Sequence, residues 1–426
     1  MAADGEQGLS DDAAPRSKES DGKVNGFAAF RHRDFCLFFF AKFFAAGSYH
    51  MILVAVLYQI YDLTGDPMNI AFINLCLIVP VFGFALFTGY VADSFDRRTV
   101  LLACYSILCV GTLGLSIESY LGITKLWLIY VLLICIGTAR AFQGPTTNSL
   151  IPNLVPREIY LNAVAWNQTA GKTAQICGPV AGGFLYLLGP EVVYGTAALT
   201  FFFGVASTYL IKPREAVRKP GSLDLQTLLE GIRFVFGKRI LLGAITIDLI
   251  AALMGGVQVM LPIFAKDILD VGAHGAGILR SSMAIGGLGA ALIFTHMRVT
   301  RAGLTMMVAC AIYGTAVMIF SYSIWFPLSV AMLAIIGCVE VVDANVRQTL
   351  MQMATPDYLR GRVGAVSSIS NSIGTEIGGF RASTMAAFVG AVPAVAIGGL
   401  VVVLAAITMP KLFPELAKVR RLDREI

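Results

Sequence analysis

The residues best suited to do chemistry are ionisable side chains inside long apolar segments. Glu340, Asp343 and Arg347 stand at i, i+3 and i+7, so a helix would place all three on one face. Arg140 lies deep inside another segment, where a charge is costly and usually faces a cavity or a partner. A carboxylate kept from water can take up a proton near neutral pH, and a nearby cation opposes this uptake. Glu340 and Asp343 are therefore the first candidates for proton binding, with Arg140 as their counter-charge.

A second set of charges in these segments has two explanations. Asp248 and Glu376 are further candidates for proton coupling. The four acids nearly balance four bases, which are Lys42, Arg140, Lys172 and Arg381. Salt bridges between helices would therefore explain many of these residues without any proton transport. His50 could titrate as well, but a single histidine in a helix is more often simply hydrogen-bonded.

Polar and aromatic residues of the same segments could line a substrate cavity. The candidates, some of them charged, are Lys42, Tyr49, His50, Gln143, Trp166, Lys172, Gln175 and Gln258. Further aromatic candidates are Phe43, Phe44, Tyr58 and Phe264. Aromatic residues on membrane helices also face lipid or pack within the protein, and this alternative stays open for each of them.

Composition identifies the elements that must position these side chains. The chain of 426 residues is 57% hydrophobic and 14% charged, whereas soluble domains carry about 25% charged residues. A helix that spans a membrane needs about 20 mostly apolar residues. Twelve segments qualify, at approximately 35–61, 69–92, 100–120, 125–150, 163–188, 192–211, 240–264, 275–297, 303–322, 325–352, 363–389 and 392–409. The sequence therefore predicts an all-α integral membrane protein with both termini on one side.

The basic residues indicate which side that is. Loops and tails on the terminal side hold most of them, including Arg31, Arg33, Arg97, Arg98 and the residues after Lys411. The opposite loops hold few cations, namely Lys125, Lys266 and Arg280, the last at an expected helix start. By the positive-inside rule, both termini are cytoplasmic.

One arrangement recurs 200 residues later (340 − 140), because Arg140 corresponds to Glu340 and Gln143 to Asp343. The repeat predicts two pseudo-symmetric six-helix bundles, a plan common among transporters. We expect these corresponding residues to face each other across the bundles. The expected organisation is a disordered cytoplasmic tail at 1–27, a first bundle at 28–211, a cytoplasmic connection at 212–239, a second bundle at 240–411 and a cytoplasmic tail at 412–426.

The connection itself shows a helical pattern. Ser222 would cap a helix that runs to Phe236. Its apolar stripe would contain Leu225, Leu228, Leu229, Ile232 and Phe236. Such a stripe is typical of an amphipathic helix that lies on the cytoplasmic face.

The loop after the second segment reads Gly89-x-x-x-Asp93-x-x-Asp96-Arg97-Arg98. It resembles the signature loop of the major facilitator superfamily, with Asp96 in place of the second glycine of that pattern. In that family the loop aspartate latches the two bundles on the cytoplasmic face. The resemblance therefore implies a gate made of Gly89, Asp93, Asp96, Arg97, Arg98 and Arg362. The alternative is an ordinary capped polar turn.

Two further motifs resemble patterns of the same superfamily. Arg140-x-x-Gln143-Gly144 is similar to a motif of proton-coupled members, and Gly178-Pro179-x-x-Gly182-Gly183 is similar to a motif of antiporters. Proline removes a backbone hydrogen bond, and glycines permit bending and close contact. The alternatives are a structural ion pair for the arginine and a packing kink for the glycines. Because Gly379 replaces the proline in the second half, the bend is expected only in the first half.

Whole stretches, at 61–65, 229–234 and 355–363, resemble the branch of drug/proton antiporters that contains enterobactin exporters and macrolide-efflux proteins. The resemblance implies proton-coupled export of a bulky amphipathic or aromatic compound, such as a siderophore or a drug, by alternating access. It also implies a monomer in the bacterial inner membrane whose partners are the substrate, protons and lipid. The alternatives are a facilitator, importer or lipid mover of the superfamily, or a receptor that does not transport.

Other classes of function lack their sequence signals. No Walker loop, metal-ligand cluster or hydrolase triad occurs. The eight cysteines lie in or beside apolar segments without a CxxC pair, so they are expected to be core residues. The net charge of +5 comes from short loops and needs no nucleic acid to explain it. We therefore expect no enzymatic activity, no cofactor and no metal.

Overall fold

The described residues are helical, and no strand occurs among them. The computed structural model describes residues 26–123, 125–212, 225–294 and 301–417. The long helices of the first half are α1 (Arg33–Thr64), α2 (Pro67–Ser94), α3 (Arg97–Tyr120), α4 (Leu126–Leu154), α5 (Tyr160–Leu185) and α6 (Pro190–Tyr209). The second half contains α8 (Arg239–Gly255), α9 (Val257–Ile263), α10 (Gly272–Phe294), α11 (Ala302–Tyr322), α12 (Phe326–Met353), α13 (Arg360–Val389) and α14 (Ala391–Leu412). Short helical turns are η1 (Ala28–Arg31), η2 (Arg157–Ile159), η3 (Tyr186–Leu188), η4 (Phe264–Ile268), η5 (Asp357–Leu359) and α15 (Pro414–Ala417).

Ten helical segments of the described chain are long and apolar enough to cross a membrane, and α8 through η4 count as one of them. The remaining two long helices, α5 and α13, have 26 and 30 residues but are more polar. Together they make twelve spans, in the order that the sequence predicts. The predicted all-α membrane fold is therefore confirmed.

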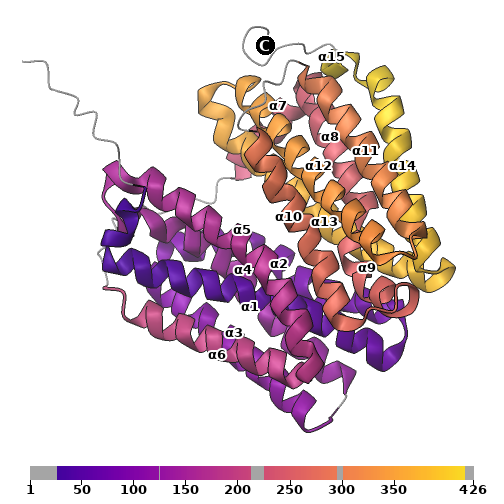
Figure 1. Cartoon of the computed structure of the whole chain (residues 1–426). Helices are drawn as coiled ribbons and strands as arrows, with labels where there is room; N and C mark the ends of the chain where they lie inside the picture. The colour runs from indigo at the N-terminus through magenta and orange to yellow at the C-terminus, as the bar shows by residue number, and fades with distance from the viewer. Residues whose placement is uncertain (1–25, 124, 213–224, 295–300, 418–426) are drawn as a thin grey trace, which may run out of the picture.

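The long helices form two groups with the same internal packing (Figure 1). In the first group α5 and α6 pack on α1, α4 and α6 pack on α3, and α2 packs on α4. In the second group α13 and α14 pack on α8, α12 and α14 pack on α11, and α10 packs on α12. Each contact in one group has its equivalent in the other. The 200-residue repeat of the sequence thus corresponds to a repeat of the helix packing.

The two bundles meet at the end of the molecule that lies away from the termini. The second half of α5 crosses the first half of α10, and α2 meets α13 in the equivalent way. A Cβ atom on Gly277 would lie 2.4 Å from the Pro179 carbonyl oxygen and 3.2 Å from the Cα atom of Gly183. The Ser281 hydroxyl donates to the Ile176 carbonyl at 2.7 Å. Only a glycine at position 277 permits this close crossing.

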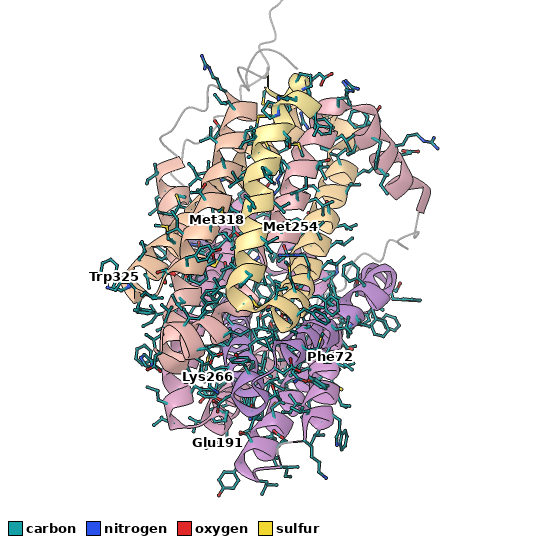
Figure 2. The ribbon with its side chains drawn as sticks, turned by 90° about the vertical axis from the view of Figure 1, so that its right-hand side faces the viewer. Phe72, Glu191, Met254, Lys266, Met318 and Trp325 are labelled. Atoms are coloured by element: carbon teal, nitrogen blue, oxygen red, sulfur yellow. The ribbon has the colours of Figure 1, made fainter. Side chains whose placement is uncertain are left out.

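Charged and hydroxyl side chains also close this end. Lys266 of η4 forms an ion pair with Asp62 near the end of α1, and the Tyr61 hydroxyl donates to Asp267. Lys266 lies in the half of the molecule opposite the C-terminal end (Figure 2). At the terminal end the two bundles diverge (Figure 1). The structure is therefore closed at one end and open toward the termini.

A break at Gly256 separates α8 from α9, where the sequence predicted one continuous helical segment at 240–264. Gly256 has a φ of 61°, in the left-handed region that glycine adopts without the cost of a Cβ. The carbonyls of Leu253 and Met254, at the end of α8, each accept a hydrogen bond of 2.9 Å from Arg381. Arg381 was counted above among the charged residues of the apolar segments. It therefore supplies hydrogen bonds to carbonyl groups that have no partner inside the helix at the end of α8.

Replacing Gly256 with alanine is expected to destabilise the second bundle by about 2–4 kcal/mol. The left-handed backbone contributes about 1–2 kcal/mol, and overpacking adds the rest, because the Cβ would lie 2.7 Å from both the Ala382 Cβ and the Gly378 oxygen. Thermal unfolding in detergent measures the change. Gly272→Ala separates the backbone cost from the overpacking cost. Gly272 also has a left-handed φ, of 64°, but the atom nearest to an added Cβ would lie 3.7 Å away, at an ordinary contact distance. If both variants lost the same free energy of unfolding, overpacking at position 256 would be ruled out as a cause.

The connection between the bundles contains α7 (Leu225–Gly237), which packs on the terminal ends of α8, α12 and α13. Val235 is 2% exposed there, whereas Phe236 is 67% exposed. Phe236 of the expected apolar stripe is therefore exposed, and the face of α7 that packs on the protein contains Gly231 and Val235, four residues apart. The placement of the stripe on the membrane surface stays a prediction. Ser222 and Leu223, expected at the start of this helix, lie outside the described residues.

Candidate functional site

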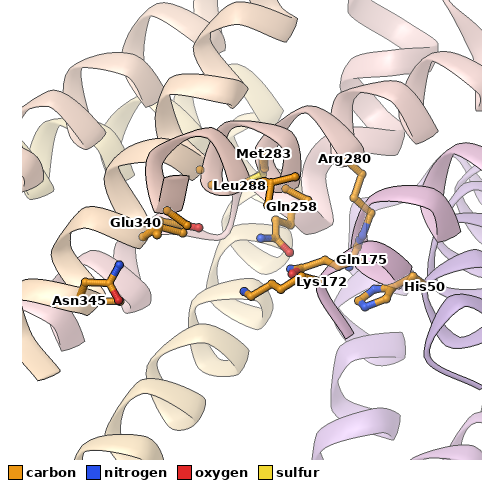
Figure 3. Close-up of a pocket in the computed structure, with 15 residues that line it drawn as sticks. His50, Lys172, Gln175, Gln258, Arg280, Met283, Leu288, Glu340 and Asn345 are labelled. Carbon is orange, nitrogen blue, oxygen red and sulfur yellow. The ribbon is translucent and has the colours of Figure 1, made fainter. Parts of the chain in front are cut away.

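A cavity of about 330 Å³ lies between the bundles, near the middle of the long helices. Its lining from the first bundle comes from α1 and α5, and its lining from the second comes from α9, α10 and α12. Five of the residues predicted from sequence line it, namely His50, Lys172, Gln175, Gln258 and Glu340. Figure 3 shows the Lys172 and Gln258 side chains in the space between Glu340 on one side and His50 on the other. The structure thus brings these five residues together.

A smaller cavity of about 140 Å³ adjoins the first and shares Gln258, Arg280, Met283 and Glu340 with it. It adds residues of α1, α2, α11 and α13 to the site. These residues are Tyr49, Asn74, Tyr313, Thr375 and Glu376. The two cavities therefore form one continuous site, in which polar groups of both bundles face each other.

Charged groups in this site interact without direct ion pairs, and two of the interactions cross the bundle interface. Glu340 interacts electrostatically with Lys172, and Glu376 interacts with Arg140 and Arg280. Within the described part of the chain, none of these five side chains belongs to an ion pair. The Arg140 guanidinium instead lies 3.7 Å from the centre of the Tyr49 ring, a cation–π contact. Arg140 and Glu340 therefore form no ion pair in this structure, and the acid that interacts electrostatically with Arg140 is Glu376.

The second bundle contains a buried ionic cluster. The Arg347 guanidinium lies 2.9 Å from an Asp248 oxygen and 3.6 Å from an Asp343 oxygen. It also donates to the Ser367 hydroxyl at 3.1 Å, and the Asn371 amide donates to both Asp248 oxygens at 3.2 Å. The cluster joins α8, α12 and α13. The counter-charge of Asp343 is thus Arg347 of its own helix, and the expected contact of Asp343 with Gln143 does not form.

A third cavity, of about 620 Å³, lies between α12 and α13 on the terminal side of this cluster. Arg347, Ser367 and Asn371 line its inner part, and the exposed Gln352 and Arg360 lie near the helix ends. It shares Ala344 with the central cavity. This cavity extends from the terminal end of the bundle to the buried cluster.

Several predicted cavity residues lie elsewhere. Lys42 donates to the Asn167 side chain at 2.6 Å within the first bundle. The Trp166 indole donates to the Gly26 carbonyl at 2.8 Å and packs among the rings of Phe27, Phe30 and Phe39. Gln143 is buried inside the first bundle. None of these three lines a cavity that is described here.

The other aromatic candidates pack with neighbouring rings. Phe264 is fully buried against Phe320, and the ring of Tyr58 meets that of Tyr186 edge to face. Phe43 and Phe44 contact each other. Among the aromatic residues proposed from sequence, only Tyr49 lines the described central cavities.

The predicted gate residues stand near the terminal ends of the helices. Gly89 and Asp93 belong to α2, but their side chains lie outside the described part of the structure. Asp96 caps α3 through the Thr99 amide at 3.1 Å. Two basic neighbours also have partners. Arg98 donates to the Thr208 and Tyr209 carbonyls, and Arg97 has a partner as well. Arg362, the expected counterpart of the latch, is paired with Glu230 of α7.

The glycine motif of α5 packs on both bundles. A Cβ on Gly178 would lie 2.7 Å from the Gly47 oxygen of α1, and one on Gly182 would lie 2.9 Å from Met51 of the same helix. Gly183 faces α10. Pro179 lies inside the helix, which is continuous over this stretch. The motif thus brings α5 close to α1 and α10, and the bend remains a prediction.

Sequence reasoning missed the most central cation. It placed Arg280 at a helix start, whereas the residue lies eight positions into α10 and lines both central cavities. The mostly apolar stretch of 273–294, which has Arg280 in its interior, was the available signal. Asn371 and Ser367 were also missed, because hydroxyl and amide residues are common on α13 and carry no distinctive spacing.

Comparisons with known proteins agree with this geometry. The sequence model of the transmembrane secretion effector family matches residues 24–424. The enterobactin exporter EntS of Citrobacter koseri is 24% identical over 397 residues, which cover 92% of this chain and 94% of that protein. Among solved structures, the nucleoside transporter NupG has a TM-score of 0.68 at 17% identity, covering 89% of this chain and 98% of its own. A bacterial homologue of the iron transporter ferroportin, in an inward-facing state, has a TM-score of 0.69 at 15% identity, covering 91% and 99%.

The family match extends over almost the whole chain, the solved relatives share its fold, and the helices suit a membrane. The chain therefore belongs to the transmembrane secretion effector family of the major facilitator superfamily, and it is a multi-pass membrane transporter rather than an enzyme.

Proposed function

We propose that this transporter exports a bulky amphipathic or aromatic compound in exchange for protons, by alternating access. One observation carries the proposal, which is a cavity between the two bundles that is lined by charged side chains of both and closed at one end. A monomer suffices, because both bundles belong to one chain. We place the protein in the bacterial inner membrane with its termini in the cytoplasm, on the basic residues of the terminal loops.

The shape and lining of the cavity support an amphipathic substrate. Met283, Leu288 and Val341 supply apolar surface, while Lys172 and Arg280 supply cations. The named relative exports enterobactin, which makes a siderophore the first substrate to test and a drug the second. With cytoplasmic termini, the open side of this structure faces the cytoplasm, where an exported substrate loads.

Alternating access would exchange the contacts that close the bundles. The Lys266–Asp62 pair and the crossing of α5 with α10 would open, and the terminal ends would close. The gate assigned from sequence to Gly89, Asp93, Asp96, Arg97, Arg98 and Arg362 would then form. In that state Arg362 would leave Glu230, its partner in the present structure.

The proton site is proposed to be Asp343, with Glu340 second. The ionic cluster contains two carboxylates and one guanidinium, so it carries an excess negative charge inside the membrane. Asp248 receives the shorter contact with Arg347 and both amide hydrogen bonds, which favour its charged form. Asp343 has only the 3.6 Å contact. Asp343 is therefore the member that takes up a proton most readily.

Reconstituted protein tests this proposal. In liposomes with an imposed pH gradient, enterobactin movement by the native chain is expected to accompany collapse of the gradient. Asp343→Asn should lose gradient-driven transport while it keeps the exchange of labelled for unlabelled substrate, because exchange needs no net proton movement. Asp270→Asn, on an exposed residue, is the matched control.

The two parts of the proposal fail separately. If the native chain transported substrate without proton movement, the protein would be a facilitator, and exchange of substrate for protons would be ruled out. Full gradient-driven transport by Asp343→Asn would leave antiport intact but remove Asp343 from it, and Glu340→Gln would be tested next.

A further inference from the structure

The helix between the bundles is fixed on the terminal face of the second bundle. Glu230 of α7 pairs with Arg362 at the start of α13. A Cβ on Gly231 would lie 3.0 Å from the Arg362 Cβ and 3.1 Å from its backbone, so α7 lies directly on α13. Val235 is buried in the cluster that contains Leu241 and Val363. The outer side of α7 therefore has a defined position in the protein (Figure 1).

A groove of about 430 Å³ runs between the outer side of α7 and η5. Its lining is Glu230, Arg233, Phe234, Gly237, Lys238, Tyr358 and Leu359. It lies where membrane spans begin and end, because α8 starts at Arg239, α12 ends at Met353 and α13 starts at Arg360. Positions at the ends of spanning helices lie in the headgroup region of a bilayer.

Two cations that line this groove lack an acidic partner in the part of the chain that the structure describes. Glu230 is already paired with Arg362, and nearby Arg239 is paired with Glu415 at 3.0 Å. The side chains of Arg233 and Lys238 have no hydrogen bond or ion pair among the described residues. The groove therefore offers two free positive charges to a ligand. An anion with oxygen acceptors would complement them.

Exposed aromatic residues flank the same groove. Phe236 is 67% exposed and lies three residues after Arg233, on the same side of α7. Tyr358 of η5 is 75% exposed. Aromatic rings at this depth favour the interface of a bilayer, where acyl chains begin. A free anion would not use these rings, whereas a phospholipid would use both the cations and the rings.

We propose that the α7–η5 groove binds the headgroup of an anionic phospholipid, with the phosphate between Arg233 and Lys238 and the acyl chains beside Phe236. Free phosphate shares the phosphate chemistry but not the apolar part, so the lipid is the occupant to which the geometry points. The inference does not depend on the proposed substrate or on proton coupling.

Lipid binding to the full chain in detergent tests this site. Native mass spectrometry is expected to show retention of dioleoylphosphatidylglycerol in preference to dioleoylphosphatidylcholine. Each basic residue near an anionic surface contributes about 1 kcal/mol, so Arg233→Gln combined with Lys238→Gln should weaken phosphatidylglycerol binding about 30-fold. Phe236→Ser should weaken lipid binding and leave binding of inorganic phosphate unchanged.

Matched controls decide the outcome. Arg31→Gln with Arg33→Gln removes the same charge from exposed positions on the terminal side of the first bundle and should leave the lipid affinity unchanged. If this control lost as much lipid affinity, binding would depend on the overall positive charge of the protein and not on this groove, and the proposal would be overturned. Equal retention of both lipids, or an unchanged lipid affinity in Phe236→Ser, would overturn it as well. Thermal unfolding of each variant shows whether the fold is kept.

Discussion

Replacing Arg347 with glutamine is expected to destabilise the transporter by about 3–5 kcal/mol, the usual cost of removing one partner of a buried ion pair. Arg347 is 8% exposed and is the shared cation of Asp248 and Asp343, at 2.9 and 3.6 Å. Its removal leaves two carboxylates of α8 and α12 without a counter-charge inside the membrane. Thermal unfolding in detergent is the measurement.

Two further variants separate the ion pair from the mere loss of a side chain. Arg347→Gln combined with Asp248→Asn leaves only Asp343 without a counter-charge and should recover part of the lost stability. Arg239→Gln makes the same change in an exposed pair with Glu415, whose side chains are 71% and 40% exposed, so it should cost less than about 1 kcal/mol. No gain from the second substitution would show that the cluster is held by packing and not by charge.

This cluster illustrates how far the sequence alone could lead. The i, i+3, i+7 spacing placed Glu340, Asp343 and Arg347 on one helix face, and depth in the membrane identified Asp248 as a costly charge. Which acid meets which base depends on where α8, α12 and α13 lie, and spacing within one helix does not contain that information. The repeat between the two halves suggested Arg140 as the counter-charge of Glu340, because corresponding residues were expected to face each other. The fold brings Lys172 to Glu340 instead.

The fold itself was more predictable, because apolar length and polar loops are local properties. Twelve spans and a two-fold repeat follow directly from the residues. The break at Gly256 was missed, since two glycines in an apolar run are also compatible with a straight helix. Its reason is tertiary: α13 comes close enough to α8 that Gly378 faces the Ala252 oxygen, where a Cβ would lie at 2.3 Å. Arg280 was missed because the start of its helix was placed too late.

Replacing Gly277 with leucine is expected to prevent closure of the end away from the termini. Even a Cβ at this position would lie 2.4 Å from the Pro179 carbonyl oxygen, and a backbone atom of a packed helix cannot move aside as a flexible side chain can. Overpacking of this kind costs about 1–3 kcal/mol, which corresponds to a shift of about 5- to 150-fold in a two-state equilibrium. The population should move away from the conformation described here, and transport should fall.

Spin labels at Leu63 and Asp270, two exposed positions on opposite bundles at the closed end, would report the change as a longer distance in pulsed electron resonance. Gly289→Leu is the matched control, because it lies on the same helix and a Cβ there would meet no atom within 4 Å. The control should keep both the short distance and transport. If Gly277→Leu also kept the short distance, the crossing of α5 and α10 would not be what holds this end closed, and the Lys266–Asp62 pair would have to do so.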